Sequence, residues 1–199
     1  MPVEKRQSLD WLVEALHTIP NIVASASHAG GLARPDSHID IGLYYREASP
    51  FSVERVRSVA EGISVPGTTP VVTDFYGWGA WVNGGAWIHT PTGKVDFLYR
   101  NLDQVQHVID EGHQGISRHD YDQQPAFGFR SVVYVGERFI CVPLYDPKGE
   151  IARKKGQLAN TPKICVDGLY RTASGTQSSD CYCARTLEML VMFTTRWAA

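Results

Sequence analysis

Three side chains that can bind a metal ion stand where two strands could bring them together. His38 and Asp40 open one apolar run, and Asp96 lies within another. Side chains at positions i and i+2 of a strand project from the same face, so His38 and Asp40 should point together, opposite to Ile39 and Ile41. If the strand that holds Asp96 lies beside the first, three potential ligands converge. Mg²⁺ prefers carboxylate oxygens and bridges them to substrate phosphates, which is the chemistry of phosphoryl and nucleotidyl transfer.

A segment of small residues precedes the first of these runs and suits a phosphate group. Its sequence, Ser-Ala-Ser-His-Ala-Gly-Gly over residues 25–31, would let backbone N–H groups approach a triphosphate closely. The candidate phosphate-binding residues are Ser27, Gly30, Gly31 and Arg34. Arg100 is a further candidate for phosphate contact, although an arginine is more often solvated or ion-paired.

The elements that must position these residues begin with a helix and two strands. Apolar residues at helical spacing after Ser8, which can act as an N-cap, predict a helix over residues 8–18 that ends before Pro20. A short strand at 22–24 then leads into the small-residue segment, and the alternation that starts at Ile39 predicts the next strand. The segment with the phosphate candidates would therefore join two strands.

The remaining elements follow from apolar spacing and turn residues. Pro50 at a first helical position predicts a helix near 51–61. Two apolar runs on either side of a Pro-Thr-Gly turn predict a β-hairpin that includes Asp96. The expected elements from the hairpin onward are strands at 86–89 and 94–100, a helix over 102–109, strands or a strand and a short element at 131–135 and 139–142, and a weaker basic helix near 149–159.

The order of these elements predicts a mixed α/β domain of the α+β kind, with a small, mixed and largely antiparallel sheet flanked by helices. We assign residues 1–160 to this domain and 161–199 to a short C-terminal tail, either a truncated or a diverged helical region. Cys165, Cys181 and Cys183 in the tail could be zinc ligands or free thiols, because their spacing lacks the second pair of a typical zinc site.

Composition and charge narrow the class of protein. The chain has 199 residues, 43% hydrophobic and 20% charged, as is typical of a globular protein. A formal net charge of -2 offers no strong attraction to nucleic acid or to an anionic membrane. No apolar run approaches the roughly 20 residues of a membrane-spanning helix, and the polar start shows no signal peptide, which predicts a cytoplasmic protein.

The order of the candidate residues resembles a known signature. The run from Ala26-Ser27, through ten intervening residues, to His38-Ile39-Asp40-Ile41-Gly42 is similar to the Gly-Ser and Asp-x-Asp motif of the DNA polymerase β-like nucleotidyltransferase superfamily. Residues 31–37, Gly-Leu-Ala-Arg-Pro-Asp-Ser, resemble the branch of small bacterial nucleotidyltransferase-domain proteins. The other matching stretches are 81–87 and 95–100, and the resemblance covers about residues 8–160.

The resemblance implies metal-dependent transfer of a nucleoside monophosphate from a nucleoside triphosphate, with ATP the expected donor, to an acceptor. Asp40 and Asp96 would be the catalytic carboxylates, with Asp96 helping to deprotonate the acceptor hydroxyl. His38, Asp40 and Asp96 would hold Mg²⁺ or Mn²⁺, and the triphosphate would lie on Ser27, Gly30, Gly31 and Arg34. The acceptor, a small molecule or a protein, is not specified by the sequence.

Two residues depart from the family's pattern. Ala26 replaces a glycine, which is tolerable if the backbone angle there suits a residue with a side chain. His38 replaces the first aspartate, and a neutral imidazole offers one nitrogen that suits Mn²⁺ or Zn²⁺ better than Mg²⁺. Catalysis would be weakened. The alternative is a catalytically inactive protein of this fold that binds nucleotide or a protein partner, with His38 an ordinary surface histidine.

Ordinary structural roles also stand beside the other candidates. Asp40 and Asp96 could be strand-end acids that cap neighbouring helices. The aromatics Trp78, Trp81 and Trp87 could line a nucleobase pocket, but aromatic side chains of a hairpin usually pack on the sheet, and we expect packing for Trp87.

Overall fold

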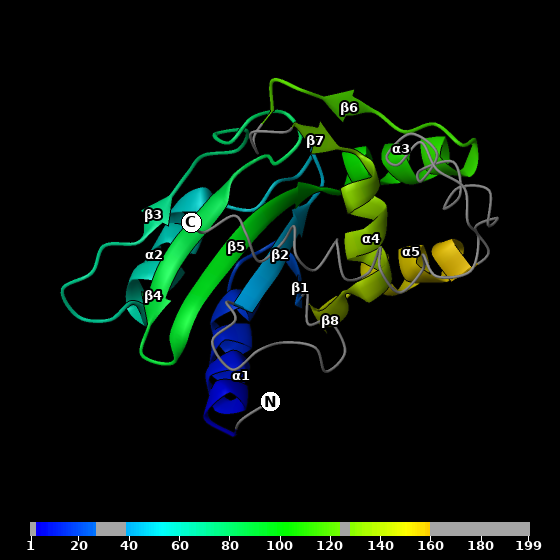
Figure 1. Cartoon of the computed structure of the whole chain (residues 1–199). Helices are drawn as coiled ribbons and strands as arrows, with labels where there is room; N and C mark the ends of the chain where they lie inside the picture. Colours follow the sequence, from blue (N-terminus) through cyan, green and yellow to red (C-terminus); the bar gives the residue numbers. More distant parts are fainter. Residues whose placement is uncertain (1–2, 27–38, 124–127, 160–199) are drawn as a thin grey trace.

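The structure, a computed structural model, describes residues 3–26, 39–123 and 128–159 (Figure 1). Within these ranges, five helices flank a six-stranded mixed sheet of strand order β3-β4-β5-β2-β1-β8. The helices are α1 (Val3–His17), α2 (Val53–Ile63), α3 (Leu102–His113), α4 (Val132–Ile140) and α5 (Glu150–Ala159). The strands of the sheet are β1 (Val23–Ala26), β2 (Ile39–Tyr45), β3 (Val71–Val72), β4 (Gly85–Thr90), β5 (Gly93–Asn101) and β8 (Val142–Tyr145). The expected class, a small and largely antiparallel α+β sheet flanked by helices, is confirmed.

The centre of the sheet is a parallel pair, β2 with β5, and the other described strand pairs are antiparallel. The predicted hairpin is present as β4 and β5, joined at a tight turn where Thr90 is opposite Gly93. A separate two-stranded ribbon, β6 (His119–Asp120) and β7 (Phe129–Arg130), lies at the top of the view in Figure 1. The sheet is therefore extended outward from one central parallel pair.

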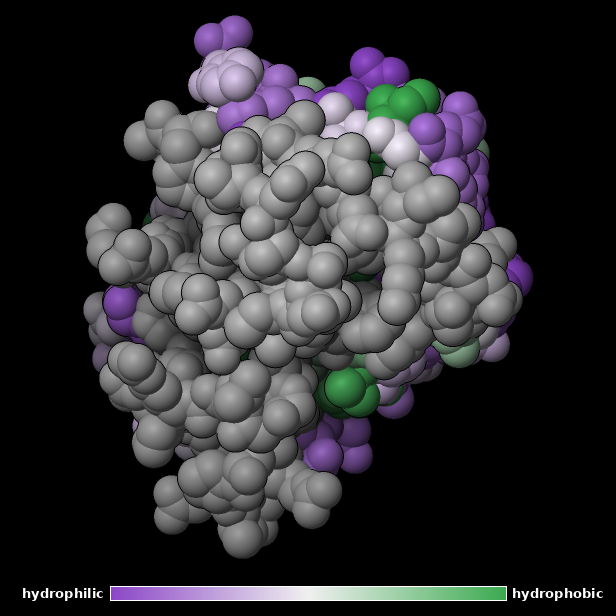
Figure 2. Space-filling view, turned by 45° about the vertical axis from the view of Figure 1, so that its right-hand side comes forward, coloured by the Kyte–Doolittle hydropathy of each residue, from purple (hydrophilic) through white to green (hydrophobic). Residues whose placement is uncertain are grey.

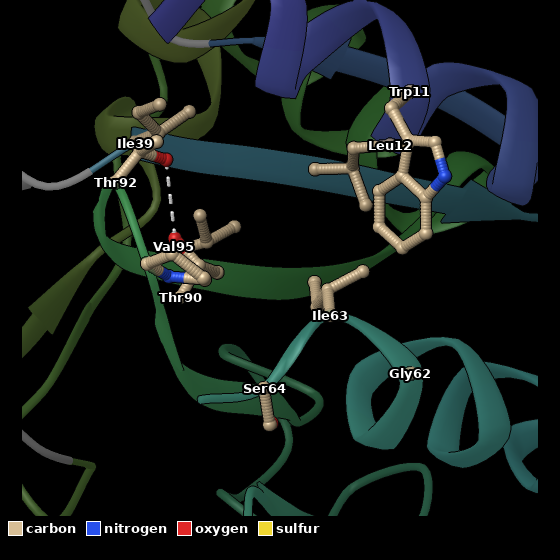
Figure 3. A pocket seen from close by; sticks show the side chains of 10 residues that line it. Trp11, Leu12, Ile39, Gly62, Ile63, Ser64, Thr90, Thr92 and Val95 are labelled. Atoms are coloured by element: carbon tan, nitrogen blue, oxygen red, sulfur yellow. Dashed lines mark hydrogen bonds between the residues drawn. The ribbon is translucent and has the colours of Figure 1, made fainter. Parts of the chain in front are cut away.

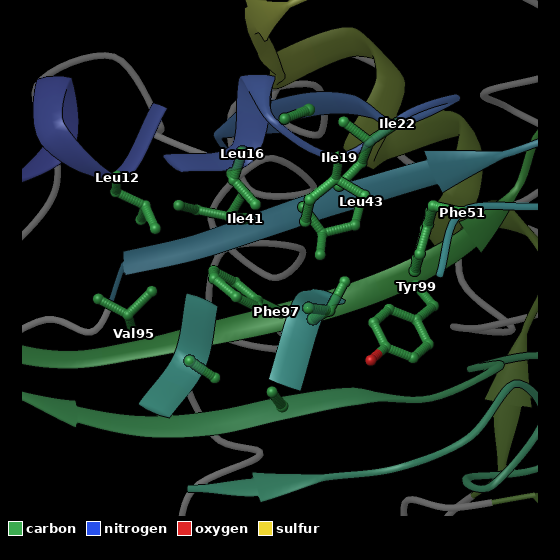
Figure 4. Close-up of a cluster of buried hydrophobic side chains, with 14 of the residues drawn as sticks. Leu12, Leu16, Ile19, Ile22, Ile41, Leu43, Phe51, Val95, Phe97 and Tyr99 are labelled. Carbon is green, nitrogen blue, oxygen red and sulfur yellow. The ribbon is translucent and has the colours of Figure 1, made fainter. Parts of the chain in front are cut away.

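One face of the sheet packs against α1 and α2. Leu16 of α1 and Val56 of α2 are fully buried with Ile41 of β2 and Phe97 of β5. Figure 4 shows Leu12, Leu16, Ile41 and Phe97 of this cluster pointing into the space between the helices and the sheet. We call this side of the sheet the core face. The apolar alternation of β2 and β5 follows from it, because every second side chain of a strand has the same face.

The opposite face is partly covered by the junction of α4 and α5. Tyr44 of β2 and Val23 of β1 are buried with Cys141, the C-cap of α4, and Ile151 in the first turn of α5. In Figure 1 these two helices lie at the right-hand side of the sheet, beyond β1 and β8. The second face is thus closed at the β1 end by helices.

Two predicted helix starts were wrong. The first helix begins at Val3, so Ser8 lies inside it rather than at its N-cap. The residues before Ser8, Glu-Lys-Arg-Gln, have high helix propensity and extend the helix toward the N-terminus. α2 begins at Val53, and its N-cap is Ser52, whose hydroxyl accepts from the backbone N–H of Arg55. A capping hydroxyl satisfies a free helix donor, which the predicted start at Pro50 would not do.

The strand predicted at 131–135 was also wrong, because this segment is the helix α4. Its β-branched valines favour a strand, but Tyr134 and Arg138 are four residues apart and both are buried. A helix places both on one side, where Tyr134 joins a cluster with α3 and Arg138 lies over the ring of Tyr44. Tertiary packing therefore overrides local propensity. The strand expected at 139–142 is displaced to β8, and the basic helix expected near 149–159 is present as α5.

Candidate functional site

Asp40 and Asp96 lie side by side in the central parallel pair. The register of β2 and β5 places Asp40 directly opposite Asp96. Their strand neighbours Ile41 and Phe97 belong to the core face, so both carboxylates project from the opposite face. Neighbouring strands are about 4.8 Å apart, which is a separation that one divalent cation can span. The two side chains are 7% and 8% exposed, so the carboxylates stand mostly away from bulk water.

Burial of the strand neighbours keeps this pair in register. Ile41 and Phe97 are both fully buried against α1 and α2. A slip of one residue between the strands would turn the buried apolar side chains of one strand away from the core face. The loss of their burial would be a large cost in free energy. The opposition of the two carboxylates is therefore a consequence of the core packing behind them.

Trp87 continues the same row on the next strand. It is the register partner of Asp96 in the β4–β5 hairpin, and its neighbours Ala86 and Ile88 are buried in the core face. Directly opposed residues of an antiparallel pair have Cβ atoms about 4.5–5.5 Å apart on the same face. The face that carries the carboxylates thus presents Trp87, Asp96 and Asp40 in a line across β4, β5 and β2. The packing expected for Trp87 is a stack on Trp78, and the side chain is still 43% exposed.

Gly42 follows Asp40 on this face and makes room for an aromatic ring. A Cβ at Gly42 would lie 2.7 Å from the ring of Tyr44, so the ring rests directly over the glycine. The Tyr44 hydroxyl accepts a hydrogen bond from Ser25 of β1 at 3.3 Å, and the guanidinium of Arg138 lies 5.0 Å from the ring centre. Burial, the first cause, raises the pKa of Tyr44 despite the opposing effect of Arg138. Tyr44 is therefore an uncharged side chain that covers part of the face carrying the carboxylates.

The predicted phosphate-binding residues and the third metal ligand lie outside the described residues. These are Ser27, Gly30, Gly31, Arg34 and His38. The chain leaves β1 at Ala26, which is the register partner of Ile41, and enters β2 at Ile39. Both ends of the intervening segment are thus next to Asp40. The cysteines of the tail, Cys165, Cys181 and Cys183, are likewise outside the described part of the chain.

The described residues fit a hard divalent cation through two carboxylates. Within the described ranges, no group of three or more His, Cys, Asp or Glu side chains could hold a metal ion. A Mg²⁺ or Mn²⁺ site of this kind needs only one or two carboxylates, because substrate phosphates and waters complete the shell. Asp40 and Asp96 supply that pair. They do not supply the nitrogen and sulfur ligands that a structural zinc site requires.

Arg100, a candidate for phosphate contact, is instead a buried structural arginine. Its Nε and Nη2 donate to the two carboxylate oxygens of Glu137 at 2.8 and 2.6 Å. Its Nη1 donates to the carbonyls of Val82 and Tyr99, and its side chain is 4% exposed. The ion-paired reading of Arg100 is the correct one, because its Nε, Nη1 and Nη2 all donate to partners within the fold and the side chain is buried. Glu137 was missed because it lies between the two segments expected as strands, 131–135 and 139–142, where the structure has the helix α4 instead.

A cavity of about 410 Å³ opens on the core-face side and does not suit a triphosphate (Figure 3). It lies between α1, the end of α2 and the β4–β5 turn, with Trp11 and Ile63 facing each other across it. Its polar groups are hydroxyls such as those of Thr90 and Thr92, which are 3.3 Å apart. No charged side chain lines it among the described residues. A triphosphate needs cations or a metal ion, so the candidate site remains on the other face.

None of the helices within the described ranges combines the length and the apolar character that crossing a membrane requires. Figure 2 shows hydrophilic described residues along the edge of the view, with hydrophobic ones among them. The exposed hydrophobic residue that lies beside the carboxylates is Trp87.

Comparisons with known proteins do not assign the chain to a family. No family model, no curated protein and no solved structure matches the chain.

Proposed function

We propose that the protein is a metal-dependent nucleotidyltransferase that transfers a nucleoside monophosphate from a nucleoside triphosphate, with ATP the expected donor, to a small-molecule or protein acceptor. The observation that carries the proposal is the direct opposition of Asp40 and Asp96 on one face of the central strand pair. The resemblance of residues 26–42 to the nucleotidyltransferase signature supports the same reading. Strand-end acids that only cap helices would not need to share a face across two strands.

The residues divide the work of the reaction. A Mg²⁺ or Mn²⁺ ion held by Asp40, Asp96 and His38 would neutralise the phosphates and the leaving pyrophosphate. Asp96 accepts the proton of the acceptor hydroxyl, whose oxygen then bonds to the α-phosphorus. The bond from that phosphorus to the bridging oxygen breaks, and pyrophosphate leaves. Ser27, Gly30, Gly31 and Arg34 are proposed to donate to the triphosphate, because their segment leaves the sheet beside Asp40.

The alternative is an inactive protein of the same fold that binds nucleotide or a protein partner. The observation that favours it is His38 in place of a carboxylate, since an imidazole binds Mg²⁺ poorly. The two readings differ in what a restored carboxylate does. His38→Asp should raise transfer a few-fold in an enzyme that already works, and should create it in a chain that has lost it.

The test is release of pyrophosphate from ATP with water as acceptor, measured with Mg²⁺ and with Mn²⁺. We expect Mn²⁺ to support more release than Mg²⁺ because of His38. Asp40→Asn and Asp96→Asn should each lower the rate about 10²-fold or more. Asp10→Asn is the matched control, since Asp10 is an exposed aspartate on α1. The Asn variants should also lose the Mn²⁺ binding that electron paramagnetic resonance detects in the presence of ATP.

Three outcomes would overturn the enzymatic reading. Failure of the wild-type protein to bind Mn²⁺ together with ATP would remove the metal site itself. Release of pyrophosphate that persists in both Asn variants would show that the carboxylate pair is not used. Release that is absent in the wild type and present in His38→Asp would establish the inactive alternative.

A further inference from the structure

We propose that Trp87, backed by Trp78, is a stacking platform for an aromatic ring of the acceptor beside Asp96. This inference rests on the proposed function and names the class of acceptor: a hydroxyl compound with a neutral or anionic aromatic ring, such as a nucleoside. Its basis is the juxtaposition of an exposed indole and a carboxylate on adjacent strands, opposite each other in register and on one face.

The first observation is the exposure of an apolar surface at this position. Trp87 is 43% exposed, and Val71, its partner on the outer strand β3, is 50% exposed. Both belong to the same row as Asp96. A large indole that is left in solvent next to a buried carboxylate costs free energy, and such exposed apolar surface commonly marks a ligand site.

The second observation is that the indole is held in place from behind. The rings of Trp78 and Trp87 stack with their centres 4.8 Å apart and an angle of 24° between the planes. A Cβ at Gly85 would lie 2.8 Å from the Trp78 ring, so that ring lies against the start of β4. The carbonyl of Trp78 accepts from Gln123 at 2.6 Å, which ties its loop to the segment before β7. A preorganised ring loses little entropy when a ligand stacks on it.

The order of the row assigns the ring to the acceptor. Asp40 is on the side of β1, where the segment proposed to hold the triphosphate leaves the sheet at Ala26. Trp87 is on the other side of Asp96, the carboxylate proposed to take the proton of the acceptor hydroxyl. A ring on Trp87 would therefore place its attached hydroxyl toward Asp96. The donor approaches from the opposite end of the row.

The charges along the same face select the kind of ring. An exposed indole can stack on an aromatic ring or lie against a cation. Two residues along from Trp87 and Asp96, the same face carries His89 and Lys94, which are register partners and both exposed. Lys94 offsets the attraction of Asp96 for a cationic acceptor and tolerates a neutral or anionic one. An aromatic ring is the ligand that this combination favours.

The experiment measures adenosine binding by equilibrium dialysis without metal. Adenosine offers an aromatic ring and hydroxyls with no phosphate. Base stacking on an aromatic residue contributes enough that Trp87→Ala should weaken adenosine binding at least about tenfold. Trp87→Phe should stay within about threefold, because a phenyl ring still stacks. Trp11→Ala is the matched control, since Trp11 is 51% exposed on α1 and lines the cavity on the core-face side. Thermal unfolding of each variant checks that it is folded.

A second arm separates the acceptor ring from the donor base. α,β-Methylene-ATP with Mg²⁺ should bind the wild type and Trp87→Ala equally, and adenosine should not displace it. Weakened binding of this analogue in Trp87→Ala, or displacement by adenosine, would assign the platform to the donor and overturn the proposal. Equal adenosine affinity in wild type and Trp87→Ala would also overturn it, as would Trp87-dependent binding of spermidine tighter than that of adenosine.

These outcomes distinguish the platform from the proposed function. Adenosine binding through Trp87 with no pyrophosphate release from ATP would leave the ring site standing while the transfer activity failed. Pyrophosphate release that depends on Asp40, together with an adenosine affinity that is the same in wild type and Trp87→Ala, would support the transfer activity and contradict the stacking platform.

Discussion

At the scale of single residues, Arg100 and Glu137 form a buried ion pair whose role is to join the sheet to α4. Arg100 comes from β5 and Glu137 from α4, and both guanidinium donors that face the carboxylate are used. Burial by itself would lower the pKa of Arg100, but the carboxylate of Glu137 raises it above its ordinary value. Arg100 therefore stays charged in the folded protein.

Loss of one partner should be costly, because it leaves the other charge buried. We expect Glu137→Gln to lower the free energy of unfolding by about 3–5 kcal/mol, measured by urea denaturation. The exposed pair Arg57 and Glu54 is the matched control, and Glu54→Gln should change stability by less than about 1 kcal/mol. Weaker ATP binding in Glu137→Gln with unchanged stability would return Arg100 to a phosphate-binding role.

At the scale of elements, the β4–β5 hairpin depends on a glycine that the neighbouring strand approaches closely. A Cβ at Gly85 would lie 1.8 Å from the carbonyl oxygen of Phe97 in β5. No rotation of a side chain relieves contact with a backbone atom. The start of β4 can therefore pair with β5 only if this residue is glycine.

Two alanine substitutions of glycine should have opposite signs. Gly85→Ala should lower the free energy of unfolding by at least about 3 kcal/mol, since the strands must move apart. Gly62→Ala in α2 should raise it by about 0.5–1 kcal/mol, because nothing lies within 4 Å of the added Cβ and alanine favours a helix. Chemical denaturation of both variants measures the contrast. A Gly85→Ala protein as stable as the wild type would show that β4 does not pair as described.

The hairpin and α4 show why elements differ in how well the sequence predicts them. In the hairpin, the Pro-Thr-Gly turn sets the pairing, and Thr90 opposite Gly93 places Trp87 opposite Asp96. That pairing is local, so the sequence already contained the signal for Trp87. In α4, the local signal of the valines points to a strand, and burial of Tyr134 and Arg138 against distant elements decides for a helix.

At the scale of the whole molecule, α5 is joined to the rest through a buried lysine and a bridging arginine. The Nζ of Lys154 donates to Gln106 of α3, and Lys154 is 3% exposed. Arg46, just after β2, binds Asp103 of α3 and Glu150 of α5 at 2.6 and 2.8 Å. Burial, with added repulsion from Arg46, lowers the pKa of Lys154 to about 8.

This lysine should make stability depend on pH with a definite sign. The pKa of Lys154 is lower in the folded protein than its ordinary value of 10.5, so the folded state disfavours the charged form. The loss of folding stability caused by burying the charged lysine is complete below about pH 8. It disappears as the pH rises toward 10.5. Lys154→Met should therefore be more stable than the wild type at pH 7, by about 1–2 kcal/mol after the lost hydrogen bond is counted.

The measurement is urea denaturation of wild type and Lys154→Met at pH 7 and at pH 9.5. The advantage of the variant should shrink at the higher pH. Lys148→Met is the control, because Lys148 is exposed, and its difference from the wild type should not change with pH. An advantage of Lys154→Met that grows with pH would contradict a depressed pKa.

The sequence by itself determined the first strands, the hairpin and the class of fold, and it singled out Asp40 and Asp96 as candidates. These properties depend on alternation and turn residues, which act over a few neighbours along the chain. It also placed His38, Ser27, Gly30, Gly31 and Arg34 in one segment, whose arrangement lies outside the described residues.

Only the tertiary structure decided that Asp40 and Asp96 oppose each other. They come from strands far apart in the chain, and their parallel register is set by burial of Ile41 and Phe97 against two helices. The same long-range packing made α4 a helix and gave Arg100 its partner Glu137. Contacts between distant segments depend on the sum of burial over the whole core, which no local pattern contains.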